Sequence, residues 1–302
     1  MALDIEAATK IPPKVVTIRV RRYNPESKKI WWQEYKVETR KGMTMLDALL
    51  AIKENIDHTL TVRYSCRMGL CGSCGVNING TPMLACQTQI SQVATNANPV
   101  ITVEPLSNFP VVKDLMTDFK DFFEKHRSVK PYLIRKDIDE QEKPKGQLKM
   151  TPEEFVDIFQ FSNCIYCGLC YASCPVVAAD PEYLGPQALM YAFRFINDAR
   201  DEGHQERFAI IDTEHGCHKC HFAATCSAVC PKAVDPAGAI QALRSKLYKY
   251  RFGFFKKKAS KPLPPPPEKG ERISLPPEAT TLPGVDLKAM EKEPVVIKLP
   301  KE

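Results

Sequence analysis

The chain has 302 residues, 44% of them hydrophobic, which is enough for two compact domains that each bury a core. Its net charge of +6 is mild and dispersed, so we expect no nucleic acid partner. Charges interrupt every apolar run before the roughly 18 residues that would cross a bilayer, so we expect no transmembrane helix.

The N-terminal third predicts a small domain of mixed structure. Thr44 can cap a helix over residues 45–52, and Asn79-Gly80 is a hairpin signal. A turn at 24–27 joins the first two of five segments with the alternation or β-branched content of strands. These segments are residues 14–22, 30–37, 75–78, 81–84 and 100–103. Residues 1–107 therefore predict an α+β domain.

The next stretch predicts a helix and a linker. Residues 111–127 carry apolar side chains at helical spacing, and the charged residues 135–149 are typical of an exposed connection. We therefore treat residues 108–149 as a helical and charged linker.

A second, helical domain is expected over residues 150–258. Thr151, Pro152 and Glu154 combine an N-cap, a proline in the first turn and an acidic residue at the third position. Pro186 and Pro236 stand in the same way before helical patterns. Residues 259–302 are rich in proline and charge, so we expect an extended arm that builds no core.

Twelve cysteines are the main functional signal. The first residues lack the basic start and apolar stretch of an export signal, so we expect the chain to stay inside the cell. Thiols in a reducing compartment remain free for coordination, which makes metal ligands a better interpretation than disulfides.

The first cysteine group follows the plant-type [2Fe–2S] spacing, C-x4-C-x2-C and a later fourth cysteine. Its members are Cys66, Cys71, Cys74 and Cys86. Gly69, Gly72 and Gly75 allow the left-handed turns and close backbone approach that direct N–H groups at a cluster. A zinc site is the alternative, but paired C-x2-C units are usual for zinc.

The second group reproduces the bacterial ferredoxin run C-x2-C-x2-C-x3-C-P, in which the fourth cysteine binds a different cluster from the first three. The third group resembles the same run, but position 223 is Ala where the middle cysteine would stand. Crossing the two runs predicts one [4Fe–4S] and one [3Fe–4S] cluster. The [4Fe–4S] ligands are Cys164, Cys167, Cys170 and Cys230, and the [3Fe–4S] ligands are Cys174, Cys220 and Cys226.

Cys217 is the twelfth cysteine and has two interpretations. It is a small buried thiol that binds nothing, or it is a fourth ligand that makes the last cluster a second [4Fe–4S].

The cysteine loops resemble a known family. Residues 63–75, which begin Arg63-Tyr64-Ser65-Cys66, and residues 84–86 closely resemble the iron–sulfur subunit of succinate dehydrogenase and fumarate reductase. Residues 167–175 and 226–236 look most like the fumarate reductase branch. The match extends from about residue 14 to about residue 250.

The resemblance implies a β-grasp ferredoxin domain followed by an all-α dicluster domain. It also implies electron transfer between FAD in a partner flavoprotein subunit and quinone beside membrane anchor subunits, with no dicarboxylate bound by this chain. The expected location is peripheral, on the cytoplasmic face of the cell membrane. Four residues match positions near quinone: Pro175, His221, Gln241 and Arg244.

Two other functions are compatible with parts of the pattern. One is the electron-transfer subunit of a thiol-coupled or soluble fumarate reductase. The other is an interaction protein that uses zinc to fold its cysteine loops and carries no electrons. Residues 248–258, which interleave aromatic and basic side chains, suit either a membrane interface or a solvated helix end.

Overall fold

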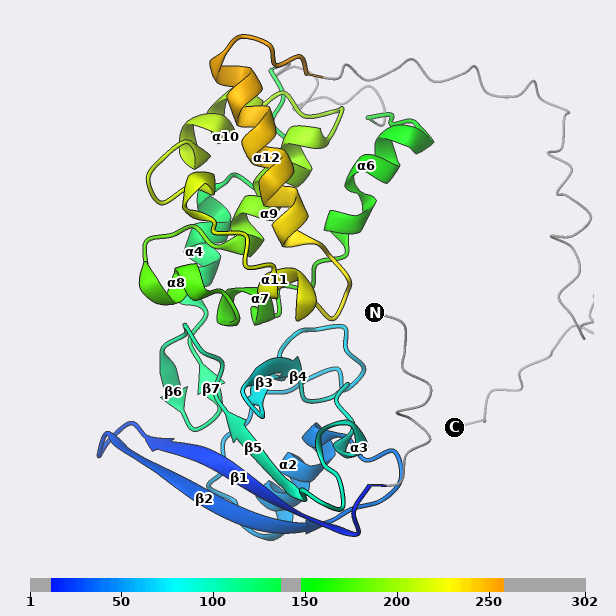
Figure 1. The fold of residues 1–302 in the computed structure, drawn as a ribbon, viewed down its shortest axis with the longest axis vertical. Coiled ribbons are helices and arrows are strands. Elements are labelled where there is room, and N and C mark those ends of the chain that lie inside the picture. The colour runs from blue at the N-terminus through cyan, green and yellow to red at the C-terminus, as the bar shows by residue number, and fades with distance from the viewer. Residues whose placement is uncertain (1–11, 137–147, 258–302) are drawn as a thin grey trace, which may run out of the picture. The chain divides into compact units, whose positions relative to one another are not determined.

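The computed structural model describes residues 12–136 and 148–257, so residues 137–147 of the predicted linker and the whole proline-rich arm lie outside the described residues (Figure 1). Two groups of elements follow one another along the chain: strands with α2 and α3, then helices from α4 onward. None of the described helices has the length and apolarity that spanning a membrane requires.

The first group is a five-stranded mixed sheet in the order β2-β1-β5-β3-β4. The strands are β1 (Val15–Asn24), β2 (Lys29–Glu38), β3 (Gly75–Ile78), β4 (Thr81–Leu84) and β5 (Val100–Glu104). All five predicted strands and the hairpin at Asn79-Gly80 are confirmed, with β1 parallel to β5 and the other pairs antiparallel. This is the β-grasp arrangement that the resemblance implies.

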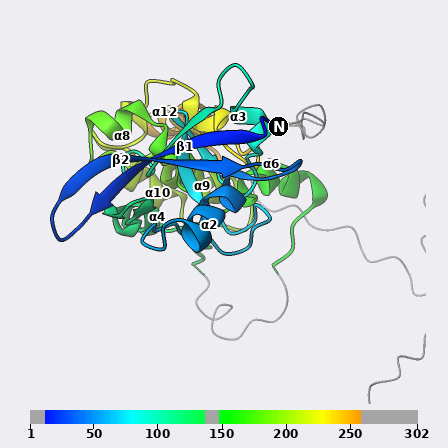
Figure 2. The same cartoon turned by 90° about the horizontal axis from the view of Figure 1, so that it is seen from below.

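The helix α2 (Met45–Asn55) lies beside the sheet in both views (Figures 1 and 2). Thr44 caps it as predicted, because its hydroxyl accepts from the Asp47 N–H while the Asp47 carboxylate accepts from the Thr44 N–H. Alternate side chains of β1 and the apolar face of α2 share one core, in which Ile18 and Leu49 are fully buried. A short helix, α3 (Ile90–Val93), follows β4.

The predicted helix over residues 111–127 is wrong in its first half. Residues 111–117 form a hairpin of β6 (Val111–Lys113) and β7 (Met116–Thr117), and only α4 (Lys120–Ser128) is helical. Asp114 turns the chain with a φ of 47°, and its buried carboxylate accepts hydrogen bonds from Arg22 and from the Thr61 N–H. Contacts with distant residues therefore override the local helical spacing.

The second group is the predicted helical domain. It consists of α6 (Pro152–Ser162), α7 (Leu169–Ala172), α8 (Pro175–Ala179), α9 (Pro186–Asn197), α10 (His204–Ile211), the 3-10 helix η1 (Cys217–Lys219), α11 (Thr225–Ala228) and α12 (Pro236–Arg251). Pro152, Pro186 and Pro236 each occupy the first turn of their helices, as predicted. The helix α9 is buried on nearly all sides, and α6, α10 and α12 pack around it.

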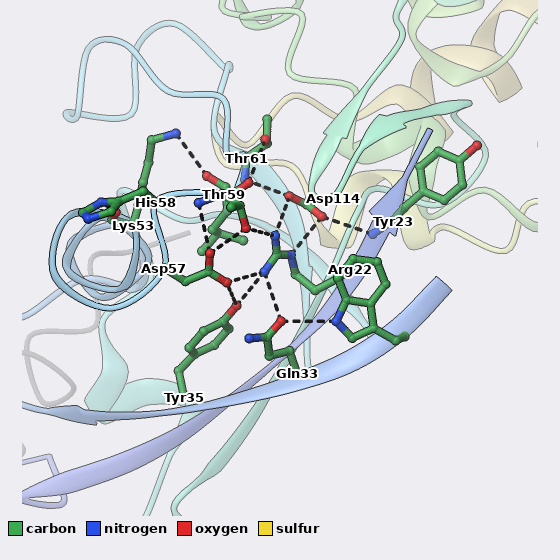
Figure 3. Close-up of polar contacts among 12 residues, drawn as sticks. Arg22, Tyr23, Gln33, Tyr35, Lys53, Asp57, His58, Thr59, Thr61 and Asp114 are labelled. Carbon is green, nitrogen blue, oxygen red and sulfur yellow. Dashed lines mark hydrogen bonds and ion pairs between the residues drawn. The ribbon is translucent and has the colours of Figure 1, made fainter. Parts of the chain in front are cut away.

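A buried arginine ties the sheet to the loop that leads into the first cysteine group (Figure 3). The Arg22 guanidinium, 3% exposed, donates to Asp114 Oδ1 at 2.9 Å and to Asp57 Oδ2 at 2.7 Å. It also donates to the Tyr35 hydroxyl at 2.6 Å and to Thr59 Oγ1 at 2.9 Å. The network thereby joins β1, β2, residues 57–61 and the β6–β7 turn.

The charges in this network stabilise one another. Burial disfavours the charge on Arg22, but its hydrogen bonds to Asp114 and Asp57 outweigh burial and raise the pKa of the guanidinium above its ordinary value. Burial likewise opposes the charge on Asp57, yet hydrogen bonds from Thr59, Tyr35 and Arg22 hold the pKa of its carboxyl well below the usual range. Loss of the cation would leave the carboxylates of Asp114 and Asp57 without a compensating positive charge.

We expect Arg22→Met to destabilise the sheet domain by about 3–5 kcal/mol, because it leaves the buried Asp114 carboxylate without its countercharge. Both tryptophans of the chain, Trp31 and Trp32, lie in β2, so their fluorescence during urea unfolding of the full chain reports on this domain. Arg19→Met is the control, because Arg19 shares the strand but pairs with Glu34 in solvent. Its expected cost is below about 1 kcal/mol, and equal losses in the two variants would contradict a central role for Arg22.

Candidate metal centres

The first cysteine group lies on a loop built from left-handed turns. Cys66 and Cys71 lie between α2 and β3, Cys74 directly precedes β3, and Cys86 follows β4. Arg67, Gly69 and Gly72 all have positive φ angles of 58–72°, so the chain coils around the Cys66 side chain. The predicted need for glycine is met at positions 69 and 72, whereas Gly75 serves close packing beside Leu106 and Leu169.

This coil directs backbone N–H groups at sulfur. Cys66 Sγ accepts from the N–H groups of Met68 at 3.4 Å, Leu70 at 3.3 Å and Cys71 at 3.3 Å. These bonds lower the pKa of the Cys66 thiol to about 6. At neutral pH the loop therefore favours a thiolate, which is the form that binds metal, and it fits a cluster whose sulfurs need N–H donors.

The four cysteines predicted to hold [4Fe–4S] line a single cavity. Its walls include Cys164, Cys167, Cys170 and Cys230, together with Ile165, Tyr166, Gly168, Gln187, Met190, Pro231, Lys232, Val234 and Pro236. Burial raises the pKa of Cys164 to about 12 and of Cys167 to about 11. Binding iron would displace these protons, because a coordinated thiol is deprotonated.

The cysteines predicted to hold [3Fe–4S] gather around a different buried side chain. Tyr183, 1% exposed, has Cys174, Cys220 and Cys226 as electrostatic neighbours, and burial raises the pKa of its phenol far above the usual range. The loop at 220–226 repeats the left-handed geometry of the first group, with Phe222 at φ 56° donating its N–H to Cys220 Sγ at 3.4 Å. Sequence reasoning missed Tyr183, which no motif marks.

Cys217 begins the 3-10 helix η1, three residues before Cys220, and its charged neighbours differ from those of Cys226. It is fully buried, and burial raises the pKa of its thiol to about 11. Its electrostatic neighbours are Arg244, Asp212 and Arg251, whereas those of Cys226 are Cys174 and Cys220.

The four residues matched to quinone positions have different environments. Pro175 begins α8 and His221 lies in the exposed 220–226 loop. Arg244 donates from Nη1 to the Cys220 carbonyl at 3.4 Å. Gln241, on the same helix, has a buried Nε2 without a hydrogen-bond partner among the described residues.

The first and second cysteine loops meet at Gly72. An added Cβ there would lie 2.8 Å from the Ile165 carbonyl oxygen and 2.9 Å from the Cys167 Cα and Cβ. Contacts this short do not occur, so only glycine permits the approach. The backbone between Cys71 and Cys74 is therefore in direct contact with a cysteine of the second group.

Asn108 and two aromatic rings hold this junction, and sequence reasoning did not find them. Asn108 Nδ2 lies 2.9–3.2 Å from the carbonyl oxygens of Tyr171, Ala172 and Cys174, where α7 ends. Gly168, at φ +75°, packs against the rings of Phe109 and Phe119. An asparagine in a loop has many uses, so position 108 carries no distinguishing signal.

Within residues 12–136 and 148–257, no three His, Cys, Asp or Glu side chains converge on a site for one metal ion. A tetrahedral zinc site would bring its thiolates to about 3.8 Å from one another, because each zinc–sulfur bond is about 2.3 Å. The described thiols do not form such a tetrahedral set.

Two family models match the chain: a 2Fe-2S iron-sulfur cluster binding domain over residues 17–124 and a 4Fe-4S dicluster domain over residues 160–234. The fumarate reductase iron-sulfur subunit of Mycobacterium tuberculosis is 44% identical over 227 residues, which cover 75% of this chain and 90% of that protein. The corresponding subunit of Haemophilus influenzae is 40% identical over 235 residues, again 75% and 90% of the two chains.

A solved structure, the Mycobacterium smegmatis Sdh1 complex in the apo form, contains a chain of the same fold. The TM-score is 0.68 at 27% sequence identity, and the match covers 79% of this chain and 97% of the other.

We expect Gly72→Ala to separate the two loops, and Gly42→Ala to serve as its control. Gly42 has nearly the same φ, +75° against +72°, but no atom within 4 Å of an added Cβ. Both changes therefore carry a backbone strain of about 1 kcal/mol, and only Gly72→Ala adds a clash. Urea unfolding and amide hydrogen exchange at residues 165–167 measure the difference. Equal stability losses and unchanged exchange would contradict the contact.

Proposed function

The chain belongs to the family of fumarate reductase and succinate dehydrogenase iron–sulfur subunits, and from this membership we propose that it relays electrons between FAD in a partner subunit and quinone at the membrane. It is an electron-transfer subunit of an oxidoreductase complex. Three successive groups of thiols, two of them meeting at Gly72, support the proposed relay.

We assign the ligands as the sequence predicts. Cys66, Cys71, Cys74 and Cys86 hold [2Fe–2S], a set supported by the N–H groups directed at Cys66. Cys164, Cys167, Cys170 and Cys230 hold [4Fe–4S], a set supported by their shared cavity. Cys174, Cys220 and Cys226 hold [3Fe–4S], supported by their common position around Tyr183.

The clusters supply one-electron chemistry when bound. The residues of this chain determine the position of each cluster and influence its reduction potential. The left-handed turns of the first loop present N–H donors, and Gly72 brings that loop against Cys167. Cys167, Cys174 and Cys226 are buried, and the other four cysteines assigned to these two clusters are partly buried, which limits access of water to the thiols.

The partners follow from the family. We place the chain peripherally on the cytoplasmic face of the membrane, between a flavoprotein subunit and membrane anchor subunits. We assign dicarboxylate binding to the flavoprotein. Quinone lies beside Pro175, His221, Gln241 and Arg244. Two observations favour this surface: Arg244 contacts the loop that carries Cys220, and Gln241 has a buried amide nitrogen free to donate.

The single observation that carries the proposal is that all four cysteines of the crossed set line one cavity, although Cys230 comes 60 residues after Cys170. The test is iron and acid-labile sulfide analysis of the complex purified without oxygen. EPR spectra of oxidised and stepwise reduced samples then distinguish the cluster types. Zinc without iron would overturn the proposal, and copurified subunits distinguish a membrane-bound from a soluble complex.

Cys71→Ala should abolish or severely alter the [2Fe–2S] EPR signal of the reduced complex, because it removes one of four thiolate ligands. The signals assigned to the helical domain should persist, because Cys71 is exposed and lies outside the [4Fe–4S] cavity. An unchanged [2Fe–2S] spectrum would reject the ligand assignment.

Cys217→Ala and Cys226→Ala separate the two interpretations of the twelfth cysteine. Because the main charged neighbours of Cys217 are Arg244, Asp212 and Arg251, its replacement should preserve the iron content and the [3Fe–4S] signal of the oxidised complex. Cys226→Ala should lose that signal. If Cys217 is instead a fourth ligand, the oxidised wild-type complex should lack the [3Fe–4S] signal, and Cys217→Ala should lower the iron content.

A further inference from the structure

One polar side chain of the [4Fe–4S] cavity has no assigned role. Gln187 lies in the first turn of α9, is 2% exposed and lines the cavity with the four cysteines. Its Oε1 is buried without a hydrogen-bond partner among the described residues. A buried polar atom left unpaired is costly, so its position beside four thiols needs an explanation.

The other end of the amide contacts His126. Gln187 Nε2 lies 2.9 Å from His126 Nδ1. The His126 ring sits edge-on to Tyr166 at 5.1 Å and to Tyr191 at 4.8 Å between ring centres. Burial, assisted by Arg127, lowers the pKa of His126 to about 4. The imidazole is therefore neutral at pH 7 and carries one N–H.

The two amide orientations differ in what they leave unsatisfied. Amide nitrogen and oxygen are nearly identical in shape, so hydrogen bonding decides which atom faces the cavity. Oxygen toward the cavity faces sulfur atoms, which accept rather than donate once they bind iron. The reverse orientation lets His126 Nδ1–H donate to Oε1 and turns Nε2 away from His126, to the position that Oε1 otherwise occupies. The second orientation gives Oε1 a donor, which the first leaves it without.

We propose that Gln187 donates an amide N–H to sulfur of the [4Fe–4S] centre and raises its reduction potential, with His126 holding the amide in that orientation. A donor to sulfur stabilises the reduced centre, which carries one more negative charge. Gln187 is thus a positioning and tuning residue for the electron relay. The inference rests on the proposed [4Fe–4S] site.

The test compares Gln187→Met with Met190→Leu in the complete complex. Methionine matches glutamine in length and lacks the donor, whereas Met190 lines the same cavity from the same helix and contributes no donor. The readout is the midpoint potential of the [4Fe–4S] centre in an EPR-monitored redox titration. We expect Gln187→Met to make reduction about tenfold less favourable, a shift of about 59 mV to lower potential for one electron. Met190→Leu should leave the midpoint near the wild-type value.

A second measurement needs no variant. The wild-type complex is prepared once with ¹⁵N in its glutamine side-chain amides and once without label. Pulsed EPR of the reduced [4Fe–4S] centre should show a hyperfine coupling to ¹⁵N in the labelled sample and to ¹⁴N in the unlabelled one. An unchanged midpoint in Gln187→Met, or a reduced centre without that coupling, would overturn the role of Gln187 while leaving the ligand assignment intact. A wild-type complex without the [4Fe–4S] centre would instead overturn the proposed function.

Discussion

The constraint on which the proposed electron relay depends is the contact between two backbones at Gly72. Electron transfer between two centres becomes slower as their separation grows, and a single Cβ at this position would collide with main-chain atoms of Ile165 and Cys167. Backbone atoms cannot move aside as a flexible side chain can. The absence of one side chain therefore determines how near the ferredoxin loop comes to the helical domain.

The surrounding residues act to keep that contact closed. Asn108 satisfies three carbonyls where α7 ends, which fixes the turn that follows Cys170. The Lys125 ammonium and the Asp121 carboxylate both bond the Tyr171 hydroxyl at 2.8 Å, which joins α4 to the same turn. On the other side, the Arg22 network anchors residues 57–61, just ahead of Cys66. The two loops are thus held from behind by separate polar networks.

The sequence predicted what local chemistry determines. Alternating strands, the caps at Thr44 and Thr151 and the proline-led helices are confirmed, because each depends on residues a few positions apart. The β6–β7 hairpin was not predicted, because the turn at Asp114 is stabilised by a hydrogen bond from Arg22, 92 positions earlier. Cysteine spacing predicted the ligand sets, because the intervals within each run match those of known cluster motifs. It carried no information on Gly168 or Asn108, whose partners lie in another domain.

The two kinds of cysteine site stabilise charge by different means. The exposed first loop surrounds Cys66 with three backbone N–H donors. Because these donors belong to the backbone, the hydrogen bonds do not depend on the side chains at those positions. The [4Fe–4S] cavity is walled largely by apolar groups, and its polar side chains besides the thiols are Tyr166, Gln187 and Lys232. Low polarity strengthens each remaining hydrogen bond. A single amide can therefore alter the potential of this centre more than one donor among many could at the first.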